Sequence, residues 1–174
     1  MIEMQSNKKI MTATFSNIAS VSPLIKNEVI ELRFCGTPAS QGSKTLTRWG
    51  GMKEASQKVA PWRASIQYAC RDQYKGPILN HPVAIYVTFV ISRRKDHWRT
   101  KKGHEHELKP SAPVHCTVGG DIDKQARALL DGLSATCGGC IIQDDRLVTR
   151  LVLNKRYANA GEPSGALVRV ETAR

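Results

Sequence analysis

The residues most suited to catalysis or metal binding are carboxylates that occur in an otherwise basic chain. Five of the seven aspartates lie between positions 121 and 145, as Asp121-Ile122-Asp123, Asp131 and the adjacent pair Asp144-Asp145, in a stretch without glutamate. The formal net charge is +11, so the protein is suited to approach a polyanion, where carboxylates would repel phosphate unless a divalent cation lay between them. The pattern predicts metal-dependent cutting of nucleic acid.

The spacing of these aspartates is compatible with one shared metal site. If Asp121 and Asp123 stand on extended backbone, their side chains point to the same side, roughly 7 Å apart at the backbone. A helix expected over 124–134 carries the chain about 16 Å away, and residues 135–143 span up to roughly 30 Å, enough to return. Asp144-Asp145 is then expected to close a site for Mg²⁺, which prefers oxygen ligands and for which Mn²⁺ would substitute.

Arg127 lies one turn into the expected helix, where it would meet the transition-state phosphate or pair with Asp131 at i+4. The competing interpretation of the acidic motifs is structural: Asp121 and Asp123 cap the helix, and Asp144-Asp145 forms a turn. Isolated pairs of this kind are common, so each motif alone favours the structural interpretation. The order of the motifs, the helix between them and the basic context favour a catalytic site.

Composition limits the class of protein. The chain has 174 residues, with 26 Lys and Arg against 15 Asp and Glu, which suits one compact domain with nucleic acid as partner and an anionic membrane surface as the rival. No apolar run reaches the roughly 18 residues of a membrane span, and the early run that breaks at Ser16-Asn17 is too short for a signal peptide. Five irregularly spaced cysteines then indicate reduced thiols and a cytoplasmic protein.

The order of elements predicts an α/β fold, a small mixed β-sheet of about four to five strands with two main helices packed on it. Strands are expected over 29–34, 83–92, 147–153 and 166–170, and helices from Pro61 to before Gly76 and over 124–134. Residues 1–27 are expected to form a polar, flexible extension, and 28–174 a single nuclease domain. This domain contains a long basic loop at 93–118, which its length marks as functional or disordered.

Exposed basic residues are the candidates for DNA contact: Lys44, Arg48, Arg93, Arg94, Lys95, Arg99, Lys101, Lys102 and Lys124. Trp49 and Trp98 lie in basic loops and are candidates for stacking on an exposed base. Trp62 lies on the apolar stripe of the first helix and is expected in the core.

A CxxC motif, Cys137-Gly138-Gly139-Cys140, has His115-Cys116 upstream of it. Two interpretations remain open: a zinc site, or a Gly-rich loop with free thiols. The adjacent His115-Cys116 is an awkward ligand pair, which favours free thiols.

The segment 120–133, GDIDKQARALLDGL, followed after a short loop by Asp144-Asp145-Arg146-Leu147-Val148, resembles the catalytic segment of RusA-type Holliday junction resolvases. These are crossover-junction endodeoxyribonucleases common in prophages, so the resemblance implies a protein of a bacterial or phage-infected cell. The resemblance covers about residues 119–156 and extends, more weakly, to the Gly- and Pro-containing segment 36–44. The family's fold and activity are therefore expected for this chain.

The resemblance also implies roles for individual residues. Asp121, Asp123 and Asp145 would be the catalytic carboxylates that bind Mg²⁺, with Asp144 beside them. Arg127 would take the place of the family's active-site lysine, a departure because a guanidinium stabilises charge but does not exchange a proton as an ammonium does. Lys124 stands where some members have asparagine.

The same resemblance implies a homodimer whose two active sites cut a four-way DNA junction symmetrically, with no small-molecule organic cofactor and no membrane partner. Two other hypotheses stay open from the sequence. One is a DNA-binding protein without catalysis, whose aspartates are structural. The other is a nuclease of the same fold that acts on flaps or on duplex DNA.

Overall fold

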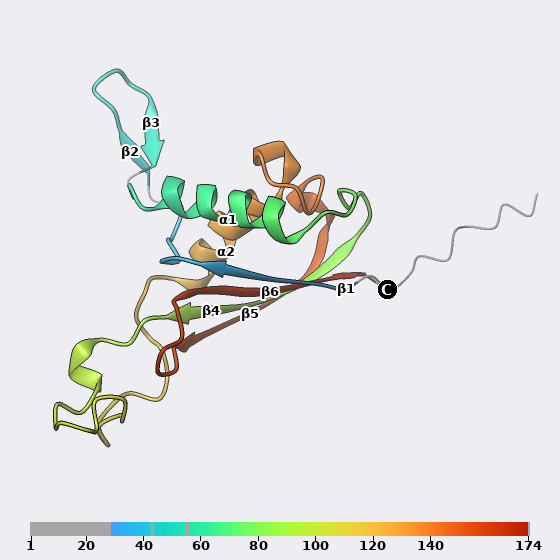
Figure 1. Ribbon diagram of the computed structural model, residues 1–174. Helices are drawn as coiled ribbons and strands as arrows, with labels where there is room; N and C mark the ends of the chain where they lie inside the picture. The colour runs from blue at the N-terminus through green and yellow to red at the C-terminus, as the bar shows by residue number, and fades with distance from the viewer. Residues whose placement is uncertain (1–28, 43, 55, 174) are drawn as a thin grey trace, which may run out of the picture.

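The computed structural model describes residues 29–42, 44–54 and 56–173; the N-terminal extension expected over 1–27 lies outside the described residues. Four strands form one mixed sheet in the order β1-β6-β4-β5. They are β1 (Val29–Cys35), β4 (Val83–Ile91), β5 (Val148–Tyr157) and β6 (Gly165–Thr172). β6 pairs antiparallel with β1 and β4, whereas β4 and β5 are parallel. Two helices, α1 (Val59–Gln73) and α2 (Ile122–Leu133), pack on one face of this sheet (Figure 1). The predicted α/β fold is confirmed.

The core lies between the sheet and the two helices. Alternation along β4 places Ile85, Val87 and Phe89 toward the helices, where each is at most 2% exposed, as expected for a central strand that packs on helices. α1 contributes Trp62 and Ile66 one turn apart, both buried. The prediction that Trp62 belongs to the core is therefore confirmed.

The two helices approach each other closely, and a glycine makes this possible. A side chain at Gly132 of α2 would come 2.8 Å from Cγ2 of Ile66 on α1, so no larger residue fits without a shift of the helices. α2 begins at Ile122, two residues before the predicted start, and Asp121 rather than Asp123 occupies the N-cap position. The prediction that both aspartates stand on extended backbone is wrong, because Asp123 lies inside the first helical turn.

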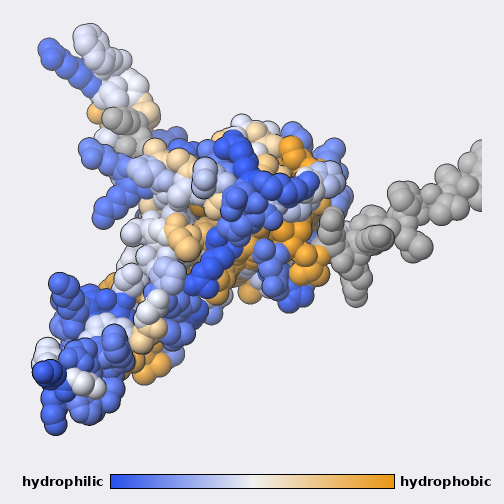
Figure 2. Space-filling view, viewed as in Figure 1, coloured by the Kyte–Doolittle hydropathy of each residue, from blue (hydrophilic) through white to orange (hydrophobic). Residues whose placement is uncertain are grey.

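Two segments project from the body on the side where α2 begins (Figures 1 and 2). The first is a hairpin of β2 (Lys44–Leu46) and β3 (Met52–Glu54), in a segment for which the sequence predicts only a loop. The second is the basic loop 93–118, which contains a short 3₁₀ helix, Lys95–His97, and an isolated bridge between Trp98 and Leu108. In the described part of the chain, no helix is long and apolar enough to cross a membrane.

Candidate active site

The first turn of α2 presents one pair of aspartates to solvent. Asp121 has an extended backbone (φ −72°, ψ 133°), and its carboxylate does not cap the helix. It accepts a hydrogen bond from Lys124 Nζ at 2.7 Å, with 63% of the Asp121 side chain exposed. This bond and the charge of Lys124 lower the pKa of Asp121, and the same contact raises the pKa of Lys124. Asp123 follows on the helix and is also exposed.

The loop before α2 is held in place by two glycines and a lysine of β5. Gly119 and Gly120 have φ of +89° and +95°, a region that side chains rarely adopt. A Cβ on Gly120 would lie 2.2 Å from Ser40 Oγ. Lys155 of β5 donates from Nζ to the Gly120 carbonyl at 2.8 Å. Sequence analysis missed Lys155, because nothing in a strand pattern indicates which loop a strand residue will contact.

Arg127 lies one turn further along α2 and faces the segment that leads from β1 to the hairpin. Its Nη1 would be 3.3 Å from a Cβ on Gly42, and the Gln41 N–H donates to the Lys124 carbonyl at 3.0 Å. Asp131, the alternative partner of Arg127, instead accepts from Gln41 Nε2 at 2.8 Å and from Arg63 Nη1 at 3.0 Å. Among the described residues Arg127 forms no ion pair, so its exposed guanidinium is available to a phosphate oxygen.

The second pair of aspartates lies in the turn before β5. Asp144 precedes a short 3₁₀ helix, Asp145–Leu147, and its carboxylate accepts from the backbone N–H and from Nε of Arg146, both at 2.9 Å. These bonds lower the pKa of Asp144. The side chain of Asp145 is exposed. Asp144 therefore has a structural role as a cap, whereas Asp145 faces solvent.

The two pairs of aspartates lie at opposite ends of α2. Ile142 forms a bridge with Ser134 directly after the helix, whereas the loop before Asp121 is bound to Lys155, near the far end of β5. From Val148 to Lys155 β5 advances about 23 Å, and the 12 residues of α2 span about 18 Å. The pairs are therefore separated by roughly 15–20 Å, too far for ligands of one ion. Within the described residues no three His, Cys, Asp or Glu side chains come together as a metal site.

The expectation that one chain closes the site is therefore wrong. The chain-length estimate permitted a return of residues 135–143 to the start of α2. This segment is instead hydrogen-bonded to Leu79. The Leu79 N–H donates to the Ile141 carbonyl, and the Gln143 N–H donates to the Leu79 carbonyl, both at 2.9 Å. These bonds fix the second pair beside the end of α2. The chemistry of the donors nevertheless fits Mg²⁺, which is commonly held by one or two carboxylates, with waters and phosphate oxygens as the other ligands.

The predicted DNA-contacting residues lie mainly on the two projections. Lys44 and Arg48 belong to the hairpin segment, and Lys124 lies beside Asp121. The basic loop carries the others, Arg93, Arg94, Lys95, Arg99, Lys101 and Lys102, and forms a largely hydrophilic lobe in Figure 2. Some are already engaged: Arg94 pairs with Asp96, Arg99 pairs with Glu107, and Arg93 lies over the ring of Tyr157, 4.4 Å from its centroid. The start of α2 lies between the bases of the two projections, because Arg127 adjoins Gly42 and Gly119 packs on Ile91.

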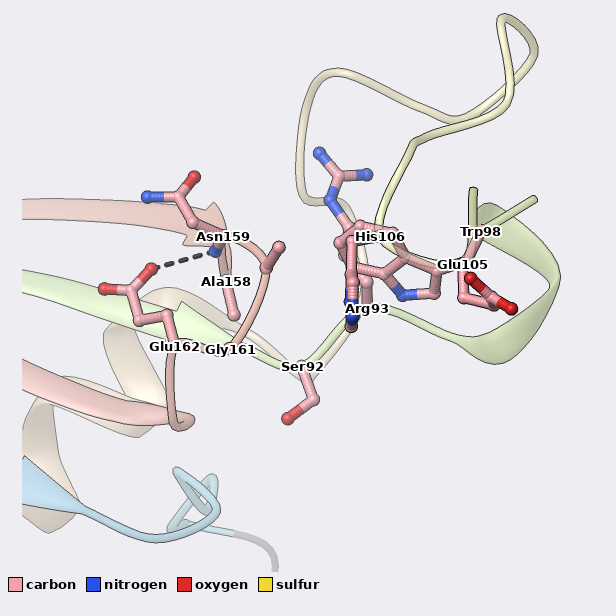
Figure 3. A pocket seen from close by; sticks show the side chains of 10 residues that line it. Ser92, Arg93, Trp98, Glu105, His106, Ala158, Asn159, Gly161 and Glu162 are labelled. Atoms are coloured by element: carbon pink, nitrogen blue, oxygen red, sulfur yellow. Dashed lines mark hydrogen bonds between the residues drawn. The ribbon is translucent and has the colours of Figure 1, made fainter. Parts of the chain in front are cut away.

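A pocket of about 290 Å³ separates the basic loop from the turn between β5 and β6 (Figure 3). Trp98, Arg93 and His106 line one side of it, and Asn159 and Glu162 line the other. Trp98 is half-buried, so it offers less of its ring for stacking on a base than Trp49, which is 90% exposed.

In the described part of the chain, the CxxC motif and His115-Cys116 do not come together as one group of ligands. All five are free thiols, and among the described residues Cys137 and Cys140 have no third ligand beside them. Cys116 is buried and donates its S–H to the Val118 carbonyl at 3.6 Å. Burial and the neighbouring Cys140 raise the pKa of Cys70 to about 12, so this thiol stays protonated.

Comparison with known proteins identifies the class to which this fold and acidic helix end belong. A family model described as endodeoxyribonuclease RusA matches residues 36–171. This range includes β4, β5 and β6 except its last residue, both helices, both projections and both pairs of aspartates, whereas β1 lies before it. The chain belongs to the RusA endodeoxyribonuclease family, as the sequence resemblance predicts. A search among curated proteins found no match.

Proposed function

We propose that this protein is a Mg²⁺-dependent endodeoxyribonuclease that resolves four-way DNA junctions by hydrolysing two symmetrically placed phosphodiesters. The observation that supports it best is the start of α2, where exposed Asp121 and Asp123 adjoin the cations Lys124, Arg127 and Lys155. Acidic ligands for a hard cation, surrounded by positive charge for a phosphate, are what metal-assisted phosphodiester hydrolysis requires. Membership of an endodeoxyribonuclease family supports the same reaction.

In this proposal Asp121 and Asp123 hold the ion together with Asp145, and Asp144 orients the turn on which Asp145 lies. Mg²⁺ bound there would neutralise the phosphate and supply an activated water. Arg127 stabilises the charge that develops on the phosphate oxygens, because a guanidinium remains charged throughout the reaction.

We further propose that the active unit is a homodimer and that each metal site takes ligands from both subunits. The separation of the two aspartate pairs in one chain supports this arrangement, since a second copy is the available source of the missing carboxylate. If a two-fold axis places Asp145 of one subunit beside Asp121 of the other, it also places the second such pair together, because both subunits use the same surface. Such a dimer would hold two equivalent sites, as symmetric cleavage of a junction requires.

The free edge of β5 is the surface that suits this dimer. β5 is the outer strand of the sheet, and in the described part of the chain no backbone bond covers its outer edge. Leu151 and Val152 of this strand are 38% and 40% exposed, and an edge strand with exposed apolar side chains is suited to pairing with another chain. If two β5 strands pair antiparallel, the start of one lies beside the end of the other. The turn with Asp145 would then approach the partner's Lys155, which is bound to the loop before Asp121.

The test of the nuclease is incubation of the full chain with a labelled four-way junction, with and without Mg²⁺. We expect Mg²⁺-dependent, symmetric cuts by the wild type, none by Asp121→Asn, and junction binding by both. Asp72→Asn, which removes the same charge from an exposed position on α1, is the matched control and should cut like the wild type. Cleavage by Asp121→Asn at the wild-type rate would contradict the assignment.

The separation of the aspartates within one chain also favours a second candidate, a DNA-binding protein without catalysis. It predicts salt-sensitive binding of the same junction with no cut in Mg²⁺ or Mn²⁺. Cutting of flaps or simple duplex in preference to the junction would instead indicate a nuclease of the same fold with a different substrate.

A further inference from the structure

The β2–β3 hairpin is a small, self-contained structure that stands away from the body (Figures 1 and 2). Its turn is closed by bonds from the Thr47 N–H to the Gly51 carbonyl at 2.7 Å and from the Gly50 N–H to the Thr47 carbonyl at 3.0 Å. Gly50 has φ of +79°, the left-handed conformation that ends a turn of this kind in short hairpin loops. The tip, Arg48-Trp49, is thereby held in a defined turn.

The hairpin exposes three large apolar side chains to solvent. Trp49 is 90% exposed, Leu46 72% and Met52 62%. Leu46 and Met52 are directly opposite each other in the strand register, so they lie on one face behind the tip. Arg48 lies 5.9 Å from the centre of the Trp49 ring, which places a cation against the indole. Apolar groups gathered at a protruding tip indicate a surface that contacts a partner.

The base of the hairpin is attached to the candidate active site. The segment that enters the hairpin is bonded to the first turn of α2 through Gln41 and Lys124, and Gly42 adjoins Arg127. From Gly42 to Trp49 the chain spans at most about 23 Å. A nucleic acid bound at Asp121 and Arg127 is therefore within reach of the tip.

We propose that the β2–β3 hairpin is a wedge that enters the branch point of a DNA junction, where Trp49 stacks on an opened base. This inference rests on the proposed function for its substrate. Branched DNA fits the hairpin because its centre exposes base faces that an indole covers, while its phosphates attract Lys44 and Arg48. Leu46 and Met52 then cover the base step next to Trp49, as apolar wedges do in proteins that unstack a duplex.

The effect of losing the indole follows from the strength of base stacking. Stacking of one base on an aromatic side chain changes affinity by roughly 10-fold to 100-fold. Trp49→Ala is therefore expected to weaken junction binding by about this factor and to leave binding of unbranched duplex unchanged. Trp49→Phe keeps an aromatic ring and should retain most of the affinity. The exposure of Trp49 makes both variants compatible with folding.

The experiment uses a four-way junction with 2-aminopurine at the branch point, in buffer containing EDTA, so that unstacking raises the fluorescence without cleavage. The wild type and Trp49→Phe should raise it, and Trp49→Ala should not, even at protein concentrations that saturate the junction. Tyr68→Ala is the matched control, because Tyr68 is an aromatic residue on α1 with 76% of its surface exposed. This control should behave like the wild type.

Three results would overturn the wedge. One is that Trp49→Ala raises the fluorescence as much as the wild type does. Another is that the wild type binds the junction without raising the fluorescence. The third is a change of oligomeric mass in light scattering, or of binding to anionic vesicles, when Trp49 is replaced, since the tip would then contact protein or membrane. Addition of Mg²⁺ to the same samples separates the proposals: a rise without cleavage leaves the wedge standing and removes the nuclease.

Discussion

The two variants Asp121→Asn and Asp145→Asn should each be inactive alone and active when mixed. If each site combines Asp121 of one subunit with Asp145 of the other, neither homodimer holds an intact site. In a mixed dimer, one site contains both substitutions and the other contains none. Free exchange of subunits makes half of the dimers mixed, so roughly a quarter of the wild-type number of sites is restored. The basis of this expectation is the separation of roughly 15–20 Å between the two aspartates in one chain.

The assay is a supercoiled plasmid with an extruded cruciform, incubated with Mg²⁺ after the two variants have been denatured and refolded together. A mixed dimer has one working site, so it should produce nicked circles and very little linear plasmid, whereas the wild type produces linear plasmid. A mixture of Asp121→Asn with Asp123→Asn is the matched control, because both changes affect the same half of the site and no dimer recovers. If mixed dimers form but remain as inactive as their parents, the site lies within one chain and the argument fails.

Three other predictions concern a strand edge, a cation and an ion pair. Val152→Glu places two like charges together where the β5 strands of two subunits would meet. It should therefore lower both the dimer fraction measured by light scattering and the binding of Mn²⁺ measured by calorimetry. Val114→Glu, the same change on the basic loop, is the control and should leave both unaltered. Arg127→Lys should keep cleavage within about 10-fold and Arg127→Ala should lower it by about 100-fold or more in single-turnover rates, because the role is electrostatic. The paired bonds from Arg156, both 2.7 Å, lower the pKa of Glu162 from 4.5 to about 2. Glu162→Gln should therefore cost about 1–3 kcal/mol of unfolding free energy in urea above pH 4.5, a loss that shrinks as the pH falls toward 2 because the wild-type carboxyl then becomes protonated.

The elements that the sequence predicted correctly are those with strong periodicity. The alternation over 83–92 and the stripe that contains Trp62 and Ile66 correspond to β4 and α1, with shifts of one or two residues at the ends. The hairpin β2–β3 was not predicted, because its strands are three residues long and its apolar residues face solvent. A pattern method recognises burial on one face, and the strand side chains of this hairpin whose exposure is described are all exposed.

The site was only partly predictable for a different reason. The sequence alone identifies the aspartates at positions 121, 123, 144 and 145, and the family match covers the segment that contains them. Their relative positions depend on bonds between Leu79 and the segment 141–143, which join parts of the chain about 60 residues apart and leave no trace in spacing. Chain-length arithmetic gives the reach of a segment but not its direction.

The segment from Gly36 to Gly42 connects the acidic end of α2 to the hairpin, and Gly42 contacts both. Gly42 has φ of +121°, and Arg127 Nη1 would lie only 3.3 Å from a Cβ at this position. An alanine there would strain the backbone and displace the guanidinium, and it would also redirect the chain that enters β2. One short segment therefore sets both the position of Arg127, which is proposed to meet the phosphate, and the direction of the hairpin tip, which is proposed to meet the bases. Cleavage and unstacking should for this reason be lost together in Gly42→Ala, whereas Trp49→Ala separates them.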